Sequence, residues 1–335
     1  MIAQLDKEYM QFSKRFAIRR VASYLLFEGR PHTTKGQWIN PFVRGFLNIL
    51  AAIPGNSHAD RPIYITGLGR SGTTILGKLL SLHKDVGFLN EPKLMWAMAD
   101  AKTDVCADYV SAGGRFCLEA VDAQPDTARM VNRILSRYTR LVGVSRAVDK
   151  YPEFIFRIDY LKATLPDAKI IFIARNGIDA VASVANWSQV KGVQKDGQVD
   201  DWWGRGDIKW TYLCEQILTV NPDYSDVVNL GLNKIDHANR AALEWIVTMR
   251  QGLQAVENNP DLVYRINYEE LVEKPREQLT QLMQACELSV SDTVLDYAEK
   301  SLYTLRKKPM PDLHAPVAAL FESTMREMGY GDMLE

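Results

Sequence analysis

The pattern of apolar and polar positions changes character near residue 61. From there on, short runs rich in β-branched residues alternate with longer stretches in which apolar residues recur at helical spacing. The clearest run, Ile170 to Ile173, is typical of a strand buried on both faces. The expected strands are residues 62–66, 86–89, 144–150, 168–175 and 262–268, and the expected helices are residues 73–83, 125–142, 151–165, 178–187 and 238–256.

Repeated strand–helix units of this kind predict an α/β fold, in which helices cover both faces of a parallel sheet. Ligands of such folds bind at the carboxyl ends of the strands. At 335 residues the chain can form one large unit that shares a core. We expect an N-terminal helical extension at residues 1–58 and a main domain at residues 59–335.

Residues 189–235 are rich in Gly, Asp, Asn and Trp, and we expect a long excursion with a helix inside it. Its tryptophans either shape a binding pocket or are simply buried. They are Trp202, Trp203 and Trp210.

The first 55 residues are helical in pattern and basic in charge. Two interpretations stay open: a solvated helical face, or an arm that contacts a membrane surface or a partner. The basic residues are Lys7, Lys14, Arg15, Arg19, Arg20, Arg30, Lys35 and Arg44, against Asp6, Glu8 and Glu28.

The composition narrows the class of protein. Lys plus Arg is 40 and Asp plus Glu is 41, so the charge balance gives no reason to expect nucleic acid as a partner. The chain shows neither the layout of a signal peptide nor an apolar run of membrane-spanning length, and we expect a cytoplasmic protein. The four cysteines form no CxxC pair and no histidine pair has the spacing of a zinc helix, so no metal site is expected.

The segment "RPIYITGLGRSGTTIL" at residues 61–76 contains the motif that indicates a ligand-binding site. Gly67 and Gly72 have the GxxxxG spacing of a P-loop between an expected strand and an expected helix, which predicts a cradle for an anion. A tight turn without a ligand is the alternative. Thr73 stands where a P-loop has its lysine, which disfavours a nucleoside triphosphate with magnesium. Thr73 also excludes a GxSxG nucleophile elbow, because that motif needs glycine there.

Four segments together resemble the sulfotransferases that use 3′-phosphoadenosine-5′-phosphosulfate (PAPS), in their bacterial and Golgi-type branch. The resemblance covers most of residues 61–290 and implies a P-loop, nucleotide-kinase-like fold. It implies PAPS as the donor, adenosine 3′,5′-bisphosphate as the product and no metal. The segments are "GLGRSGTTIL", "VGFLNEP", "VDKYPEFIFRIDYLKATLPDAKIIFIARNGIDAVAS" and "RINYEELVEKPREQLTQLMQACEL".

The resemblance also implies roles for residues of the donor site. Arg175 and Ser183 would bind the 3′-phosphate, although Arg175 could instead form a surface ion pair. The residues that would hold the 5′-phosphate and the sulfonate are Arg70, Ser71, Gly72, Thr73 and Thr74.

The same resemblance implies the catalytic groups. Glu91 in "NEP" would be the general base, and we expect burial to raise its pKa. Lys150 would lie near the bridging oxygen and, with Arg70, would stabilise the charge of the leaving group. The alternatives are a loop or capping glutamate and a solvated lysine at a strand end.

Weaker candidates each have a structural alternative. Tyr268 lines the nucleotide or belongs to the core, and Trp187 stacks on adenine or packs. Arg306 and Lys307 in "YTLRKKP" resemble a late basic segment that contacts the 3′-phosphate, or they are solvated charges.

The sequence therefore predicts transfer of a sulfuryl group from PAPS to a hydroxyl acceptor, which would be a carbohydrate, a lipid or a small metabolite. The acceptor would bind near the excursion at residues 189–235. Two alternatives stay open: a small-molecule kinase with a degenerate P-loop, and a nucleotide-binding protein without turnover.

Overall fold

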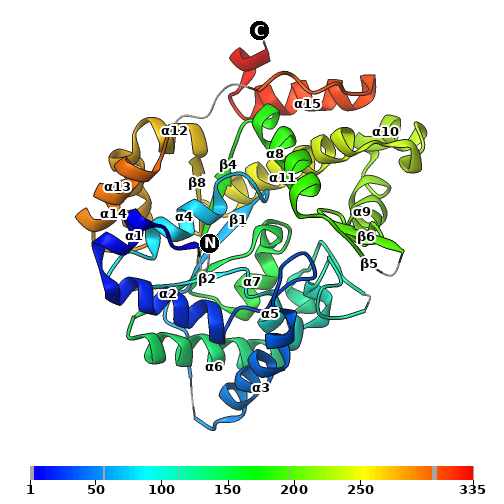
Figure 1. Cartoon of the computed structure of the whole chain (residues 1–335). Helices are drawn as coiled ribbons and strands as arrows, with labels where there is room; N and C mark the ends of the chain where they lie inside the picture. The colour runs from blue at the N-terminus through cyan, green and yellow to red at the C-terminus, as the bar shows by residue number, and fades with distance from the viewer. Residues whose placement is uncertain (1–3, 56, 112, 196, 304–307, 335) are drawn as a thin grey trace.

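A computed structural model describes residues 4–334, apart from residues 56, 112, 196 and 304–307. Its centre is a five-stranded parallel sheet in the order β2-β3-β1-β4-β8, and helices cover both faces (Figure 1). The strands are β1 (Ile63–Gly67), β2 (Val86–Asn90), β3 (Arg146–Lys150), β4 (Lys169–Ala174) and β8 (Val263–Asn267). The predicted α/β fold and all five predicted strands are confirmed.

The strand β1 lies in the middle of the sheet and leads into the glycine loop. All five residues of β1 are buried, as are the five residues from Ile170 to Ala174 in β4. Gly67 is in register with Ile173, so β1 and β4 end at the same edge of the sheet. Asn90 and Lys150 are likewise in register where β2 and β3 end.

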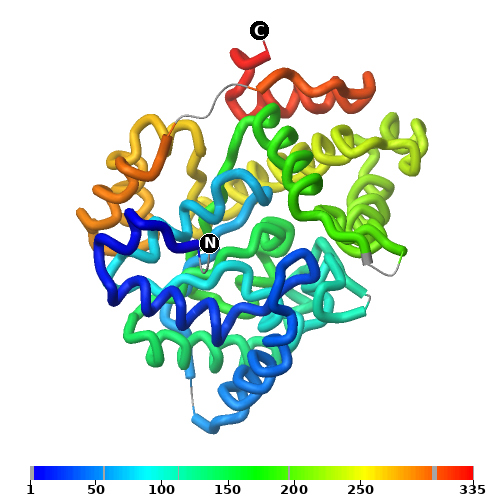
Figure 2. Tube along the Cα trace, in the orientation of Figure 1, coloured from blue at the N-terminus to red at the C-terminus, as the bar shows by residue number. Residues whose placement is uncertain are grey.

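The helices form two layers with separate apolar cores. One layer packs its apolar side chains against one face of the sheet in a core that includes Ile65, Leu79 and Leu282. The helices of that layer are α1 (Lys7–Phe12), α4 (Thr73–Leu80), α13 (Pro275–Ala285) and α14 (Asp292–Ser301). Figure 2 shows the blue N-terminal helices against the orange helices α13 and α14.

The second layer covers the other face around Phe172 and Trp245. Its helices are α3 (Asn40–Ala52), α5 (Lys93–Ala99), α6 (Pro125–Val142), α7 (Ile158–Thr164), α8 (Gly177–Lys191), α11 (His237–Asn258) and α15 (Ala315–Glu327). Other described helices are α2 (Lys14–Leu26), α12 (Tyr268–Glu273), η2 (Gln37–Ile39), η3 (Ala101–Thr103), η4 (Ala120–Asp122), η7 (Pro222–Tyr224), η8 (Leu232–Lys234) and η9 (Gly331–Leu334). Of the described helices, none is long and apolar enough to cross a membrane.

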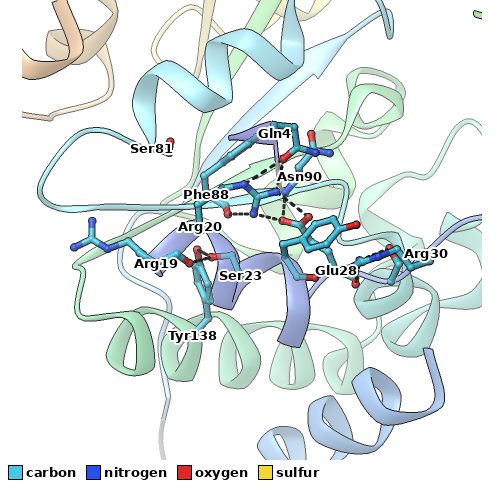
Figure 3. A network of polar contacts seen from close by, with 12 residues as sticks. Gln4, Arg19, Arg20, Ser23, Glu28, Arg30, Ser81, Phe88, Asn90 and Tyr138 are labelled. Carbon is cyan, nitrogen blue, oxygen red and sulfur yellow. Dashed lines mark hydrogen bonds and ion pairs between the residues drawn. The ribbon is translucent and has the colours of Figure 1, made fainter. Parts of the chain in front are cut away.

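The predicted N-terminal helices are present, but a solvated basic face is wrong for Arg19, Arg20 and Arg30, which are all buried. The reason is that α2 covers β2, an edge strand with unpaired carbonyl groups. Arg19 donates a hydrogen bond to the carbonyl oxygen of Val86 at 3.0 Å. Arg20 donates to the carbonyl oxygen of Phe88 at 3.3 Å (Figure 3).

The single helix predicted over residues 151–165 is wrong, because the segment divides into η5 (Pro152–Phe156) and α7. Arg157, between the two, is fully buried, and its backbone is not helical, with φ −138° and ψ 33°. Its guanidinium donates to the carbonyl oxygens of Phe116 at 3.0 Å and Thr103 at 3.2 Å. These bonds to a distant loop explain the break.

The excursion at residues 189–235 contains more structure than one helix. The end of α8 leads into a small antiparallel sheet, and Trp203 and Trp210 pack edge to face beneath it with ring centroids 5.7 Å apart. Both tryptophans are buried, which confirms the packing interpretation for these two. The elements are β5 (Val193–Lys195), β6 (Gln198–Asp201), β7 (Gly204–Arg205), α9 (Ile208–Leu213), the π-helix η6 (Cys214–Leu218) and α10 (Ser225–Asn229).

Candidate active site

A cavity of about 320 Å³ opens at the carboxyl edge of the sheet. The glycine loop contributes Arg70 and Thr74 to its lining, and the ends of β2 and β3 contribute Glu91 and Lys150. Other lining residues come from the N-terminal segment, from the loop before Tyr109 and from the excursion: Glu28, Arg30, Thr34, Cys106, Asp200 and Trp202. The N-terminal segment is therefore part of the cavity wall.

The loop between β1 and α4 is built closely around its glycines. Gly67 has φ 127° and a Cβ there would come within 2.6 Å of the carbonyl oxygen of Ile173. Gly72 has φ 92° and a Cβ there would come within 2.4 Å of the Tyr268 ring. The hydroxyl of Ser71 is buried, and among the described residues it has no hydrogen-bond partner. A loop of this shape at the start of α4 offers donors to an anion.

Three residues predicted for the donor site lie against one another. Arg70 Nε donates to the hydroxyl of Ser183 at 3.3 Å, and Arg175 donates to the carbonyl oxygen of Arg70 at 2.7 Å. The Arg175 guanidinium lies 4.7 Å from the centre of the Tyr268 ring and 3.5 Å from Asp179. The structure thus brings together side chains from the glycine loop, from the residue after β4, and from α8 and α12.

This cluster has the electrostatics of an anion site. Burial lowers the pKa of Arg70, and the nearby charge of Arg175 lowers it further. Arg175 is itself 6% exposed, and its Nε has no hydrogen-bond partner in the described part of the chain. Two guanidinium groups held this close are stabilised by an anion that pairs with both.

Glu91 and Lys150 form an ion pair at the ends of β2 and β3. Glu91 takes the left-handed conformation at φ 55°, and its N–H donates to the carbonyl oxygen of Lys150 at 2.9 Å. A non-glycine residue held in this conformation is strained, as is common at functional sites. The Glu91 side chain keeps 34% of its area exposed, whereas Lys150 keeps 4%.

The pKa predicted for Glu91 was in the wrong direction. Burial alone would raise the pKa, but the ammonium groups of Lys150 and Lys93 outweigh burial and hold the pKa below its ordinary value. Lys93 Nζ lies 3.6 Å from the second carboxylate oxygen of Glu91. Glu91 is therefore an ionised carboxylate with two cationic neighbours.

The N-terminal segment holds the end of β2 next to Glu91. Glu28 accepts a hydrogen bond from the backbone N–H of Asn90 at 2.8 Å, and the same carboxylate forms a buried ion pair with Arg20 at 2.6 Å (Figure 3). Arg20 in turn donates to the carbonyl oxygen of Phe88. These bonds hold in place the backbone of β2 that directly precedes Glu91.

The sequence analysis missed four charged residues that line the same cavity. Lys93 pairs with Glu153 at 3.0 Å, and Lys209 pairs with Glu244 at 2.6 Å. Burial would raise the pKa of Glu153, but Lys93 and Lys209 outweigh it and lower the pKa to about 2. Lys93 and Glu153 could have been found from their places two residues after Glu91 and three after Lys150. Lys209 and Glu244 belong to no motif.

Two tryptophans cover the glycine loop. A Cβ on Gly69 would come within 2.5 Å of the Trp202 ring, so the indole rests on the loop backbone. Trp202 donates a hydrogen bond to Glu244 and lies 4.5 Å below the ammonium of Lys209. Trp187 packs edge to face on Trp202 at 5.4 Å, and both line the cavity.

Two further predictions concern the late basic segment and the absence of a metal site. Arg306 and Lys307 lie outside the described residues. Within the described ranges, no group of three or more His, Cys, Asp or Glu side chains is arranged to hold a metal ion.

Comparison with known proteins bears on this arrangement. Residues 62–223 match the model of the sulfotransferase family, a span that contains the glycine loop, Glu91, Lys150, Arg175 and Ser183. The matched segment is just under half of the chain. Tyr268 and the final strand β8 lie beyond it.

Two relatives share part of the sequence of this chain. An uncharacterized protein of Aquifex aeolicus is 25% identical over 260 residues, 74% of this chain and 28% of that protein. Nodulation protein NoeE of Sinorhizobium fredii is 29% identical over 126 residues, 36% of this chain and 30% of that protein. The chain thus spans less than a third of the length of either relative.

Among solved structures, the sulfotransferase domain of the curacin biosynthetic pathway aligns with a TM-score of 0.46 and 15% identity. The alignment covers 82% of this chain and 99% of that domain.

Proposed function

We propose that this protein moves a sulfuryl group from PAPS to a hydroxyl group. The observation that carries the proposal is the juxtaposition of two sites. A guanidinium cluster on a glycine loop adjoins the Glu91–Lys150 pair, and Arg70 lines one cavity with both residues of that pair. The first can hold an anionic donor, and the second has a base and a cation for the transfer.

The residues present fit such a donor. The buried hydroxyl of Ser71 and the buried Nε of Arg175 are hydrogen-bond donors that lack a partner in the described structure, which is costly unless a ligand binds. We assign the 5′-phosphate and sulfonate to the loop, with Arg70, Ser71, Gly72, Thr73 and Thr74. We assign the 3′-phosphate to Arg175 and Ser183. The Tyr268 ring packs against the Arg175 guanidinium. The donor, when bound, supplies the activated sulfuryl group.

Glu91 takes the proton of the acceptor hydroxyl while the acceptor oxygen forms its bond to sulfur. The bond between sulfur and the 5′-phosphate oxygen breaks, and its electron pair leaves on that oxygen. Lys150 and Arg70 stabilise the charge that develops there.

The Glu91–Lys150 pair suggests how the base is activated. An anion on the loop competes with Glu91 for the Lys150 ammonium, and the weakened pairing raises the pKa of Glu91 towards that of a useful base. Donor binding and proton removal would then be coupled through one lysine.

Thermal unfolding with added nucleotide tests this proposal. Adenosine 3′,5′-bisphosphate at 100 times its dissociation constant is expected to stabilise the protein by about 2.7 kcal/mol, without magnesium. An Arg175→Ala variant should lose most of this stabilisation. Stabilisation by magnesium and ATP, but not by the bisphosphate, would instead favour a P-loop kinase and overturn the proposal.

The acceptor is proposed to be a carbohydrate, a lipid or a small metabolite with a hydroxyl group. It would enter the cavity beside Glu91, between the N-terminal segment and Trp202. Several buried charges line this space, so an acceptor with polar groups around its hydroxyl fits better than a purely apolar one.

A further inference from the structure

The helix α3 is apolar on two opposite faces. Its inner face places Val43, Leu47 and Leu50 in the core, where they are buried. Its outer face also carries large apolar side chains, which continue from η2 to the end of α3 and lie in solvent. These are Trp38, Phe42, Ile49 and Ile53, with 75%, 69%, 62% and 44% of their area exposed, and they are called the α3 stripe below.

The spacing of the α3 stripe makes it one surface. Its members are separated by four, seven and four residues, which places them on one side of a helix with 3.6 residues per turn. Single exposed apolar residues are ordinary, but a contiguous stripe that includes Trp and Phe is typical of a docking surface. The helix lies at the lower edge of the molecule in Figure 1.

The charges around the stripe point to an anionic partner. Residues 29–59 contain no aspartate or glutamate, and two of their basic residues, Lys35 and Arg44, are exposed. Two copies packed through this face would bring like charges together, which disfavours a second copy as the occupant. An apolar helix face with Trp, Phe and basic neighbours matches the boundary of an anionic lipid bilayer.

The segment that precedes the stripe in the sequence lines the active-site cavity. Arg30, Thr33 and Thr34 line the cavity, and Trp38 follows Thr34 by four residues. Arg137 fixes the other end of α3, because it donates to the carbonyl oxygens of Leu50 and Ile53, both at 2.7 Å. A short stretch of chain thus joins the cavity wall to the stripe.

We propose that the α3 stripe docks this protein on an anionic membrane surface, with Trp38 and Phe42 at the level of the lipid headgroups. The docking proposal rests on the exposure of the α3 stripe and on the positive charge of the segment around it. It does not depend on the proposed sulfuryl transfer. Resting on that proposed function, docking would present the cavity to a hydroxyl group carried by a membrane lipid or a lipid-linked molecule.

Vesicle flotation with the full chain tests the docking. The vesicles are phosphatidylcholine, with or without phosphatidylglycerol as about a third of the lipid. The protein is expected to float with the anionic vesicles and to bind neutral ones at least about tenfold more weakly, because part of the attraction is electrostatic.

A triple variant removes the stripe: Trp38→Ser, Phe42→Ser and Ile49→Ser. We expect binding to anionic vesicles to fall at least about tenfold, because three apolar side chains leave the interface. The matched control replaces exposed valines elsewhere, Val121, Val220 and Val290, by serine and should bind like the wild type. Thermal unfolding and bisphosphate binding, measured for both triple variants, show that each remains folded.

Three results would overturn the docking proposal. The first is no flotation of the wild type with anionic vesicles. The second is equal flotation of the stripe variant and the wild type. The third is a dimer, detected by light scattering, that the stripe variant abolishes while vesicles bind neither form, which would assign the stripe to a second copy. None of these results bears on nucleotide binding, so the proposed transfer is tested separately.

Discussion

A Glu91→Gln variant is expected to lose roughly 10²–10⁴-fold in kcat for sulfuryl transfer and to keep its affinity for adenosine 3′,5′-bisphosphate. Glutamine has nearly the same shape but cannot accept the proton of the acceptor hydroxyl. The loop, Arg70 and Arg175 are unchanged, so the donor should still bind. Release of labelled bisphosphate from PAPS in the presence of an acceptor measures the loss, and calorimetry measures the affinity.

The control for this variant is Glu257→Gln, an exposed glutamate at the end of α11. It should leave both turnover and affinity unchanged. Near wild-type turnover in Glu91→Gln would remove Glu91 from the mechanism. A parallel loss of bisphosphate affinity would show instead that the glutamate supports the donor site.

A Lys150→Met variant is expected to lose roughly 10²–10³-fold in kcat, because a fixed cation no longer stabilises the leaving phosphate. It should also change the pH dependence. In the wild type, Lys150 and Lys93 outweigh burial and keep the pKa of Glu91 below its ordinary value. Without Lys150 the pKa rises, and the acid limb of the kcat/KM profile should move to higher pH.

The pH profile separates this role from a purely structural one. Lys162→Met removes an exposed lysine of α7 and should change neither the rate nor the acid limb. Circular dichroism at each pH confirms that the variants stay folded. A slower Lys150→Met enzyme with an unmoved acid limb would contradict the pairing of Lys150 with Glu91 as the cause of the lowered pKa.

The sequence predicted those parts of the site that depend on local pattern. The apolar run Ile170–Ile173 predicted the buried strand β4, and the GxxxxG spacing predicted the loop between β1 and α4, because both patterns are local. Glu91 and Lys150 were each expected as catalytic groups, and Lys150 was expected at a strand end. That they form a pair depends on β2 lying next to β3, which only the order of the sheet establishes.

The parts that were missed depend on contacts between distant segments. Lys209 and Glu244 come from α9 and α11, and no pattern in either local sequence predicts that they pair next to Trp202. The burial of Arg19 and Arg20 follows from β2 being an edge strand whose carbonyl groups need donors. Charge pattern alone could not distinguish that role from a solvated face.

The central claim is that the loop and the Arg175–Ser183 site together bind a 3′,5′-bisphosphate donor. Its most direct test is calorimetric titration of adenosine 3′,5′-bisphosphate and of adenosine 5′-phosphate into the wild type and Arg175→Ala. The wild type should prefer the bisphosphate at least about tenfold, as expected for hydrogen bonds between charged groups, and Arg175→Ala should lose that preference. Equal affinities for the two nucleotides in the wild type, or an unchanged preference in Arg175→Ala, would contradict the claim.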